Sequence, residues 1–182
     1  MTSGRNRVRI IGGQWRSRIV RFSPSAQLRP TPDRVRETLF NWLGQRVDGS
    51  RCLDLFAGSG ALGFEALSRG ARRVVMVERD REVARALEAS ARTLEARGAQ
   101  IVHDDALAYL GRAKERFDLA FVDAPYASDL AARAIELLPR VLEPRARVYL
   151  ESAETPDLPE RWTLLRADRA GAVRYALYEL AP

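Results

Sequence analysis

The sequence predicts an α/β protein with a mostly parallel sheet that is completed by an antiparallel C-terminal hairpin. From Arg51 onward, short apolar runs alternate with amphipathic segments, the pattern of strands that alternate with helices. The first apolar run breaks at a glycine-rich turn that leads into a helical pattern. Near the end, two apolar runs flank Asp168-Arg-Ala-Gly-Ala, which is typical of a hairpin. A length of 182 residues suits a single main domain.

The chain begins with a basic segment. Two short alternating stretches between Val8 and Phe22 surround Gly12-Gly13, which predicts a β-hairpin with Trp15 near its tip. Four arginines lie on its polar side: Arg9, Arg16, Arg18 and Arg21. Arginines beside an exposed aromatic side chain suit RNA, whereas the alternative is an edge hairpin whose charges only deter aggregation. We therefore divide the chain into a basic N-terminal extension, residues 1–27, and a main domain, residues 28–182.

The first helix has clear start and stop signals. Thr31 is predicted as its N-cap, Pro32 as its first residue, and Gly44 as its end. Arg29, Thr31 and Arg34 lie at the positive end of this helix and could reach the carboxylate of a bound ligand, although capping and surface charge explain them nearly as well.

The remaining elements follow from periodicity and turn residues. Strands are predicted at 52–56, 74–78, 100–103, 118–122, 146–151, 162–166 and 173–180, and helices at 60–69, 81–97, 106–113 and 129–142. Ligands of such sheets bind beyond the carboxyl ends of the parallel strands. Functional side chains are therefore expected at those ends.

The turn after the first of these strands suits a nucleotide-like ligand. Gly58, Gly60 and Gly63 spell G-x-G-x-x-G, and Glu78 ends the next strand, where an acid can bind ribose hydroxyls. This pattern fits NAD. Asp54 argues against NAD, because a carboxylate in this position repels a pyrophosphate but attracts the ammonium and sulfonium of S-adenosylmethionine (SAM). We predict a SAM site that includes Asp54, Phe56, Ala57, Gly58, Ser59, Gly60, Glu78 and Arg79.

Two further strand ends carry acids. Asp105, followed by Ala106, could accept the exocyclic amine of an adenine ring or simply cap the next helix. The next strand ends in Asp123-Ala-Pro-Tyr. The carboxylate of Asp123 and the carbonyl of Ala124 can accept the two hydrogens of an exocyclic amine, after rigid Pro125 the ring of Tyr126 can stack on the base, and Asp123 can take the amine proton. The sequence therefore predicts a pocket for a planar amino heterocycle.

Composition argues against several other classes of protein. The net charge of +6 is uneven, because residues 1–46 hold ten arginines and two acids, a balance of +8, and the rest of the chain balances at −2. The single cysteine, Cys52, and the single histidine, His103, argue against a metal centre and against Cys/His catalysis. No apolar run is long enough to span a bilayer, and the N-terminus lacks a signal-peptide core. We expect a cytoplasmic protein without a bound metal.

These motifs resemble a known family. Asp54-Leu-Phe-Ala-Gly-Ser-Gly together with Asp123-x-Pro-Tyr is similar to SAM-dependent amino-methyltransferases of nucleic acids. Arg9-Ile-Ile-Gly-Gly-x-Trp-Arg-Ser-Arg and Arg29-Pro-Thr-Pro-Asp-Arg-Val-Arg-Glu-Thr-Leu-Phe-Asn-Trp-Leu narrow the resemblance to the bacterial 16S ribosomal RNA guanine-966 N2-methyltransferases. The resemblance implies a Rossmann-like seven-stranded methyltransferase sheet, a flipped guanine, and a monomer that acts on the small ribosomal subunit.

One position departs from the family pattern, and two alternatives remain open. The family reads Asp-Pro-Pro-Tyr, and Ala124 replaces its first proline. Because Ala124 still precedes a proline, we expect its carbonyl to keep its direction, at a cost of about 0.4–1 kcal/mol in preorganisation. An adenine N6-methyltransferase would present the same motif, and a non-catalytic RNA-binding module could retain the same fold.

Overall fold

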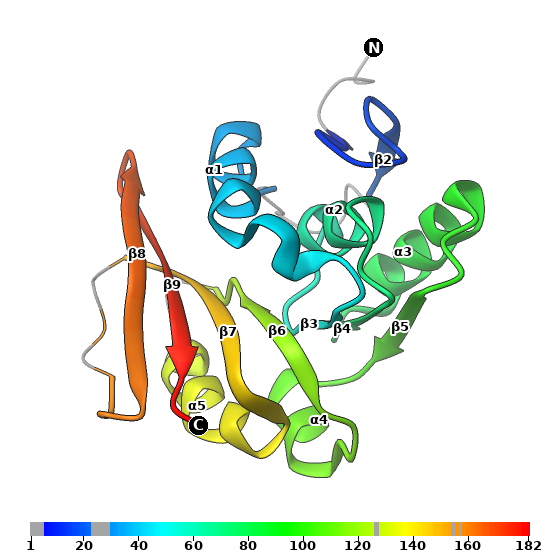
Figure 1. Cartoon of the computed structure of the whole chain (residues 1–182). Coiled ribbons are helices and arrows are strands. Elements are labelled where there is room, and N and C mark those ends of the chain that lie inside the picture. Colours follow the sequence, from blue (N-terminus) through cyan, green and yellow to red (C-terminus); the bar gives the residue numbers. More distant parts are fainter. Residues whose placement is uncertain (1–5, 23–29, 126–127, 154–155, 157) are drawn as a thin grey trace.

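A seven-stranded sheet forms the centre of the protein in a computed structural model that describes residues 6–22, 30–125, 128–153, 156 and 158–182 (Figure 1). Its strands are β3 (Arg51–Asp54), β4 (Arg73–Glu78), β5 (Ala99–His103), β6 (Phe117–Val122), β7 (Leu142–Ser152), β8 (Trp162–Ala170) and β9 (Val173–Leu180). Their order across the sheet is β5-β4-β3-β6-β7-β9-β8. The first five run parallel, and β9 lies antiparallel between β7 and β8. The predicted fold class is confirmed.

Helices cover both faces of the sheet (Figure 1). On one face pack α1 (Asp33–Leu43), α2 (Ala61–Ser68) and α3 (Arg81–Leu94), and on the other α4 (Ala106–Arg112) and α5 (Leu130–Leu137). Successive strand residues alternate between the two cores: Cys52 belongs to the α1–α3 side and Leu53 to the α4–α5 side. The strand order reverses at β3, which pairs with β4 on one side and β6 on the other. This is the position where sheets of this kind bind ligands.

The N-terminal segment forms a separate two-stranded sheet of β1 (Arg7–Arg9) and β2 (Ile19–Arg21). It packs on α2, where the buried carboxylate of Glu65 accepts hydrogen bonds from the backbone N–H groups of Ile11 and Gly12, both at 2.8 Å. The strands are shorter than the predicted hairpin, because residues 10–18 form the connection instead of extending the ladder. The boundary predicted at residue 27 lies outside the described residues.

A fully buried arginine holds this hairpin to the main domain. The Arg36 guanidinium contacts Glu65 at 3.2 Å and Asp33 at 2.6 Å, and it donates to the backbone carbonyl of Arg9 at 3.0 Å. Its Nε also donates to the carbonyl of Thr31 at 3.2 Å. The network thus joins the hairpin, α1 and α2 through one side chain.

Several predicted boundaries are wrong by a few residues: the strand predicted at 52–56 ends at Asp54, and the helix predicted at 81–97 ends at Leu94. Three others differ for identifiable reasons. Helix α1 starts at Asp33, preceded by Pro32 without a side-chain cap, because the Thr31 hydroxyl points to two carboxylates instead. The helix predicted to 142 ends at Leu137, then forms a 3₁₀ turn, Leu138–Arg140, and β7 begins at Leu142. The last hairpin turns at Gly171, so β8 continues to Ala170.

Candidate active site

The glycine-rich turn brings backbone N–H groups and an acid together at the end of β3. Gly58 and Gly60 have φ values of +50° and +75°, a backbone conformation that residues with a side chain rarely adopt. A Cβ on Gly60 would lie 2.6 Å from Leu87. The Gly58 N–H donates to Glu78 at 3.0 Å, so the turn is fastened to the end of β4. The predicted strand, turn and helix are present, with the positive end of α2 at the turn.

Asp54 lies beneath this turn. Its carboxylate is buried and accepts a hydrogen bond from the Gly63 N–H at 3.0 Å. The same closeness explains the third glycine, because a Cβ at position 63 would lie 3.1 Å from Asp54 and 2.9 Å from Met76. Burial, aided by the charge of Glu78, raises the pKa of Asp54 to about 7. A cation bound here would favour the ionised carboxylate.

The ends of four strands open into one pocket of about 630 Å³. Most residues predicted for the cofactor line it: Asp54, Phe56, Ala57, Gly58, Ser59, Glu78, Arg79, Asp105 and Ala106. The residues predicted to hold the base, Asp123, Ala124 and Pro125, line the same pocket. Gly60 lies at the start of α2 next to this lining. Tyr126 lies outside the described residues.

Glu78 and Asp105 already have backbone partners. Glu78 accepts from Gly58 and, through its second oxygen, from the Asp80 N–H at 2.8 Å. Asp105 is the N-cap of α4, and its Oδ1 accepts from the Leu107 and Ala108 N–H groups, both at 3.0 Å. Asp105 therefore does cap α4, as the second interpretation predicted, and it also lines the pocket.

A second group of polar side chains meets Asp123 at the end of β6. The Thr31 hydroxyl lies 3.1 Å from a Glu151 carboxylate oxygen and 3.5 Å from an Asp123 carboxylate oxygen. The Tyr149 hydroxyl donates to Glu151 at 2.8 Å. Burial, and then the nearby charge of Glu151, raise the pKa of Asp123 well above its usual range. Sequence reasoning missed Glu151, although its place at the end of a predicted strand was a usable signal.

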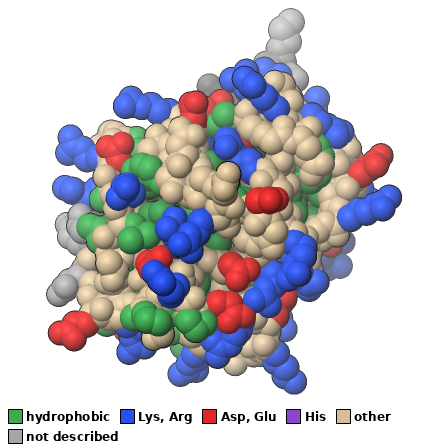
Figure 2. Space-filling model, viewed as in Figure 1, with side chains coloured by type: hydrophobic (Ala, Val, Ile, Leu, Met, Phe, Trp, Pro, Cys, Tyr) green, Lys and Arg blue, Asp and Glu red, His purple; other side chains and the backbone are tan. Residues whose placement is uncertain are grey.

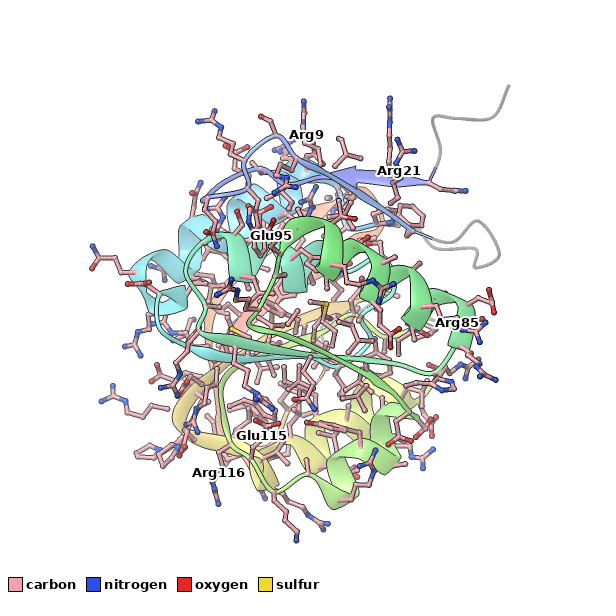
Figure 3. The ribbon with its side chains drawn as sticks, turned by 90° about the vertical axis from the view of Figure 1, so that its right-hand side faces the viewer. Arg9, Arg21, Arg85, Glu95, Glu115 and Arg116 are labelled. Carbon is pink, nitrogen blue, oxygen red and sulfur yellow. The ribbon has the colours of Figure 1, made fainter. Side chains whose placement is uncertain are left out.

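The predicted RNA-binding residues divide into two groups. Arg9, Arg16, Arg18 and Arg21 are exposed. Figure 3 shows Arg9 and Arg21 on the outer side of the hairpin, and Figure 2 shows basic side chains at the top of the molecule, where this hairpin lies. The prediction that the Trp15 ring offers a surface for stacking on RNA is wrong. The side chain is only 9% exposed and belongs to the core. The connection folds its ring inward, and the backbone N–H of Trp15 donates to the Ser68 hydroxyl at 2.9 Å.

Two other features bear on function. Among the described residues, no three His, Cys, Asp or Glu side chains are arranged to hold a metal ion. In the same part of the chain, no helix combines the length and the apolar character needed to cross a membrane.

Comparison with known proteins places these features in context. The sequence model described as "Conserved hypothetical protein 95" matches residues 8–179. The ribosomal RNA small subunit methyltransferase D of Escherichia coli K12 is 44% identical over 182 residues, which cover 97% of this chain and 92% of that protein. The solved structure of the Escherichia coli protein yhhF is 43% identical, with a TM-score of 0.89 over 96% of this chain and 98% of that one.

A more distant structure shares the fold. The Thermus thermophilus 16S rRNA N2 G1207 methyltransferase, solved in complex with AdoMet and guanosine, has a TM-score of 0.73 at 21% identity. The match covers 97% of this chain and 50% of the Thermus thermophilus chain. At this identity the likeness concerns the fold alone.

Proposed function

This chain belongs to the Conserved hypothetical protein 95 family, and we propose that it is a SAM-dependent methyltransferase that modifies a guanine N2 amine in 16S ribosomal RNA. The full-length similarity to a ribosomal RNA small subunit methyltransferase supports the enzyme class and the RNA substrate. Position 966 and the small ribosomal subunit in the cytoplasm as the site of action follow from the family resemblance. The alternatives, adenine N6 methylation and a non-catalytic module, have no particular observation in their favour.

One observation carries the proposal: Asp54 and Asp123 open into the same pocket. They follow neighbouring strands, because Asp54 pairs with Phe121, two residues before Asp123. A carboxylate suited to a cationic methyl donor therefore lies beside one suited to an amine acceptor. The volume of about 630 Å³ is within the range of pockets for small ligands, roughly 300–1,000 Å³.

The residues of the turn fit SAM. A Cβ on Gly60 would clash with Leu87 and Phe64, so this glycine lets the turn pack closely against α2 and α3. At the pocket, Asp54 and Glu78 supply negative charge and acceptors for an ammonium and for ribose hydroxyls. When bound, SAM supplies a methyl group already activated on a sulfonium, so the chain must mainly provide alignment. Asp105 remains available at the pocket for the adenine amine.

The residues after β6 would orient the guanine. One Asp123 oxygen and the Ala124 carbonyl accept the two N2 hydrogens, which turns the nitrogen lone pair toward the methyl carbon. Tyr126 is assigned to stacking on the base by the family motif alone. Asp123 is also the first acceptor for the proton that N2 loses as its new bond to carbon forms.

Transfer to ribosomal particles tests the proposed function. Small subunits from a strain that lacks this modification are incubated with the protein and methyl-labelled SAM, and the RNA is digested to nucleosides. We expect the label in N2-methylguanosine. Label in N6-methyladenosine would favour the adenine alternative, and SAM binding without transfer would favour the non-catalytic module.

SAM binding should depend on pH through Asp54. The pKa of Asp54 in the fold, about 7, is higher than that of an unfolded aspartate. Between about pH 4 and pH 7 the folded, ligand-free chain therefore holds a proton that the unfolded chain has released. The free energy of unfolding falls as pH rises through this window. Ionised Asp54 is the form that attracts a cation. We therefore expect SAM affinity, measured by calorimetry, to fall several-fold between about pH 8 and pH 6.

The Asp54→Asn variant is the control for this pH dependence. The amino group of SAM titrates equally in both experiments, so the difference between variant and wild type isolates Asp54. We expect weaker binding and a flatter pH profile for the variant. Equal slopes in the two proteins would show that Asp54 does not bind the cationic part of SAM.

RNA binding should depend on the hairpin arginines. The double variant Arg16→Gln and Arg21→Gln removes two exposed guanidinium groups, so we expect weaker RNA binding and a salt dependence whose slope falls by about one to two. The matched control, Arg85→Gln with Arg133→Gln, removes the same charge from α3 and α5, where both side chains are exposed. An equal loss in both double variants would mean that only net charge matters.

A further inference from the structure

Four arginines meet beside the end of α1, on the face of the sheet that this helix covers. Arg46 lies in the 3₁₀ turn Gly44–Val47 that follows α1, Arg145 and Arg147 lie on β7, and Arg166 lies on β8. We call these four residues the arginine cluster. Figure 2 shows basic side chains gathered over β7, β8 and β9, apart from the hairpin at the top. Neither the proposed chemistry nor the hairpin accounts for them.

The charges of the arginine cluster have few partners. Glu179 on β9 lies near two of them, with carboxylate oxygens 3.6 Å from Arg145 Nε and 3.8 Å from Arg147 Nε. Both distances are too long for a hydrogen bond. Within the part of the chain that the structure describes, Arg46 has no ion pair, and Arg166 donates only to a neighbouring backbone carbonyl. Positive charge is therefore in excess here.

Arg147 shows this excess most clearly. Its side chain is 18% exposed, and its buried Nε is the one buried side-chain polar atom among the described residues that lacks a hydrogen-bond partner. Such donors are rare in native proteins. Burial, and then the charge of Arg46, lower the pKa of Arg147; Glu179 opposes this shift, and Arg166 adds to it. The guanidinium groups thus repel one another, and an anion between them would relieve the repulsion.

The backbone of β7 is distorted where it carries these side chains. Asp118 on β6 lies opposite four residues of β7, 143–146, so the ladder is irregular. Within this stretch Arg145 has a φ of +62°, which residues with a side chain rarely adopt. Irregular strands and strained residues are typical of functional sites. The distortion leaves a cavity of about 320 Å³, which Arg145, Arg147 and Arg46 line.

The charges around this cavity select its ligand. Two acids also line it, Asp118 and Glu143, and both pair with Arg51, at 3.6 Å and 2.7 Å. With Glu179, three carboxylates face five guanidinium groups, so the balance is positive. Guanidinium groups bind phosphate oxygens with paired hydrogen bonds. A phosphate-bearing ligand fits this surface best.

We propose that the arginine cluster binds the phosphate backbone of the RNA substrate, as a second contact surface in addition to the N-terminal hairpin. This inference rests on the proposed function for the identity of the RNA. Arg147 pairs with Leu119, four residues before Asp123, so the cluster lies about 13 Å along β6 from the pocket. Helix α1 joins the two places, because it follows Thr31 of the pocket lining and precedes Arg46. One RNA segment can therefore contact both.

RNA binding by a double variant tests this surface. Arg46→Gln with Arg166→Gln removes two exposed charges without breaking an ion pair, so the melting temperature should be equal to or above that of the wild type. We expect roughly fivefold to tenfold weaker binding, both to small subunits and to naked 16S RNA, at about 0.1 M salt. The slope of the salt dependence should fall by about one to two. Calorimetry with SAM checks that the pocket is intact.

The matched control is Arg85→Gln with Arg133→Gln, which removes the same charge from α3 and α5. Equal losses in the two double variants, or no loss in Arg46→Gln with Arg166→Gln, would overturn the proposal. Weaker binding to subunits with unchanged binding to naked RNA would also overturn it, because the cluster would then contact a protein of the subunit.

Phosphate-ethylation interference separates this inference from the proposed function, because it needs no methyl transfer. Ethylation removes the charge of single phosphates, and the positions where it weakens binding of the wild type mark contacts. We expect about one or two of these positions to lose their effect in Arg46→Gln with Arg166→Gln, and different positions in Arg16→Gln with Arg21→Gln. An unchanged pattern, or the same positions in both variants, would contradict a second surface. Absence of methyl transfer by the wild type would count against the proposed function alone.

Discussion

Replacing Asp123 with alanine should abolish methyl transfer while SAM affinity stays within about twofold to threefold of wild type. The change removes the acceptor that orients the amine and the first acceptor of its proton, and such groups contribute about 10²- to 10⁴-fold to rate. The protein should stay folded, because Asp123 is a carboxyl whose pKa is raised by burial and by Glu151, so its ionised form is unfavourable in the fold. Single-turnover transfer to small subunits and calorimetry with SAM measure the two effects.

The matched control for this variant is Asp129→Ala, six residues further along the chain. The Asp129 side chain is 73% exposed, and its ion pair with Arg133 has a long spacing of 3.9 Å. We expect normal transfer in the control. If Asp123→Ala loses SAM affinity and transfer together, Asp123 supports the pocket as a whole and does not act on the base.

Replacing Arg36 with methionine should destabilise the protein by about 3–5 kcal/mol in urea unfolding, the usual cost of removing one partner of a buried ion pair. Arg36 and Glu65 are both fully buried and 3.2 Å apart. The variant leaves the Glu65 carboxylate with Arg69 as its remaining cation and removes the donor to the Thr31 and Arg9 carbonyls. Because these contacts hold the hairpin, Trp15 should become exposed, which shifts its fluorescence to longer wavelength.

Arg85→Met is the comparison for Arg36→Met. Arg85 pairs with Glu82 at 3.0 Å on the outside of α3, with side chains 58% and 64% exposed (Figure 3). Exposed pairs contribute about 0–1 kcal/mol, so the free energy of unfolding should barely change. A loss of less than about 1 kcal/mol in Arg36→Met would mean that the buried network does not hold the hairpin to the domain.

Local sequence signals were sufficient for the sheet and for much of the pocket. The glycine spacing after Asp54 specifies a turn with positive φ, and the acid at each strand end follows from where an apolar run stops. Parallel strands bring those ends to one edge, so the sequence alone places Asp54 and Asp123 together. The resemblance to the family, based on the same residues, is confirmed by the full-length relatives.

Features that depend on contacts between distant segments could not be predicted in this way. Thr31 has the residue type and position of an N-cap, and only contact with Glu151, 120 residues away, shows why its hydroxyl turns elsewhere. Trp15 follows an alternating pattern that suggests exposure, yet the connection buries it against α2. The ion pair of Arg36 and Glu65 joins two different helices, and nothing in the local sequence indicates that these two charges neutralise each other in the interior.

The central claim is that the methyl donor and the guanine bind in one pocket, between Asp54 and Asp123. The most direct test is calorimetric titration with a bisubstrate ligand, in which the adenosyl and amino-acid parts of SAM are joined through a short carbon linker to N2 of guanosine. We expect one ligand per chain, tighter binding than SAM, displacement by SAM, and weaker binding in both Asp54→Asn and Asp123→Ala. Binding no tighter than that of SAM, or unaffected by Asp123→Ala, would contradict the claim.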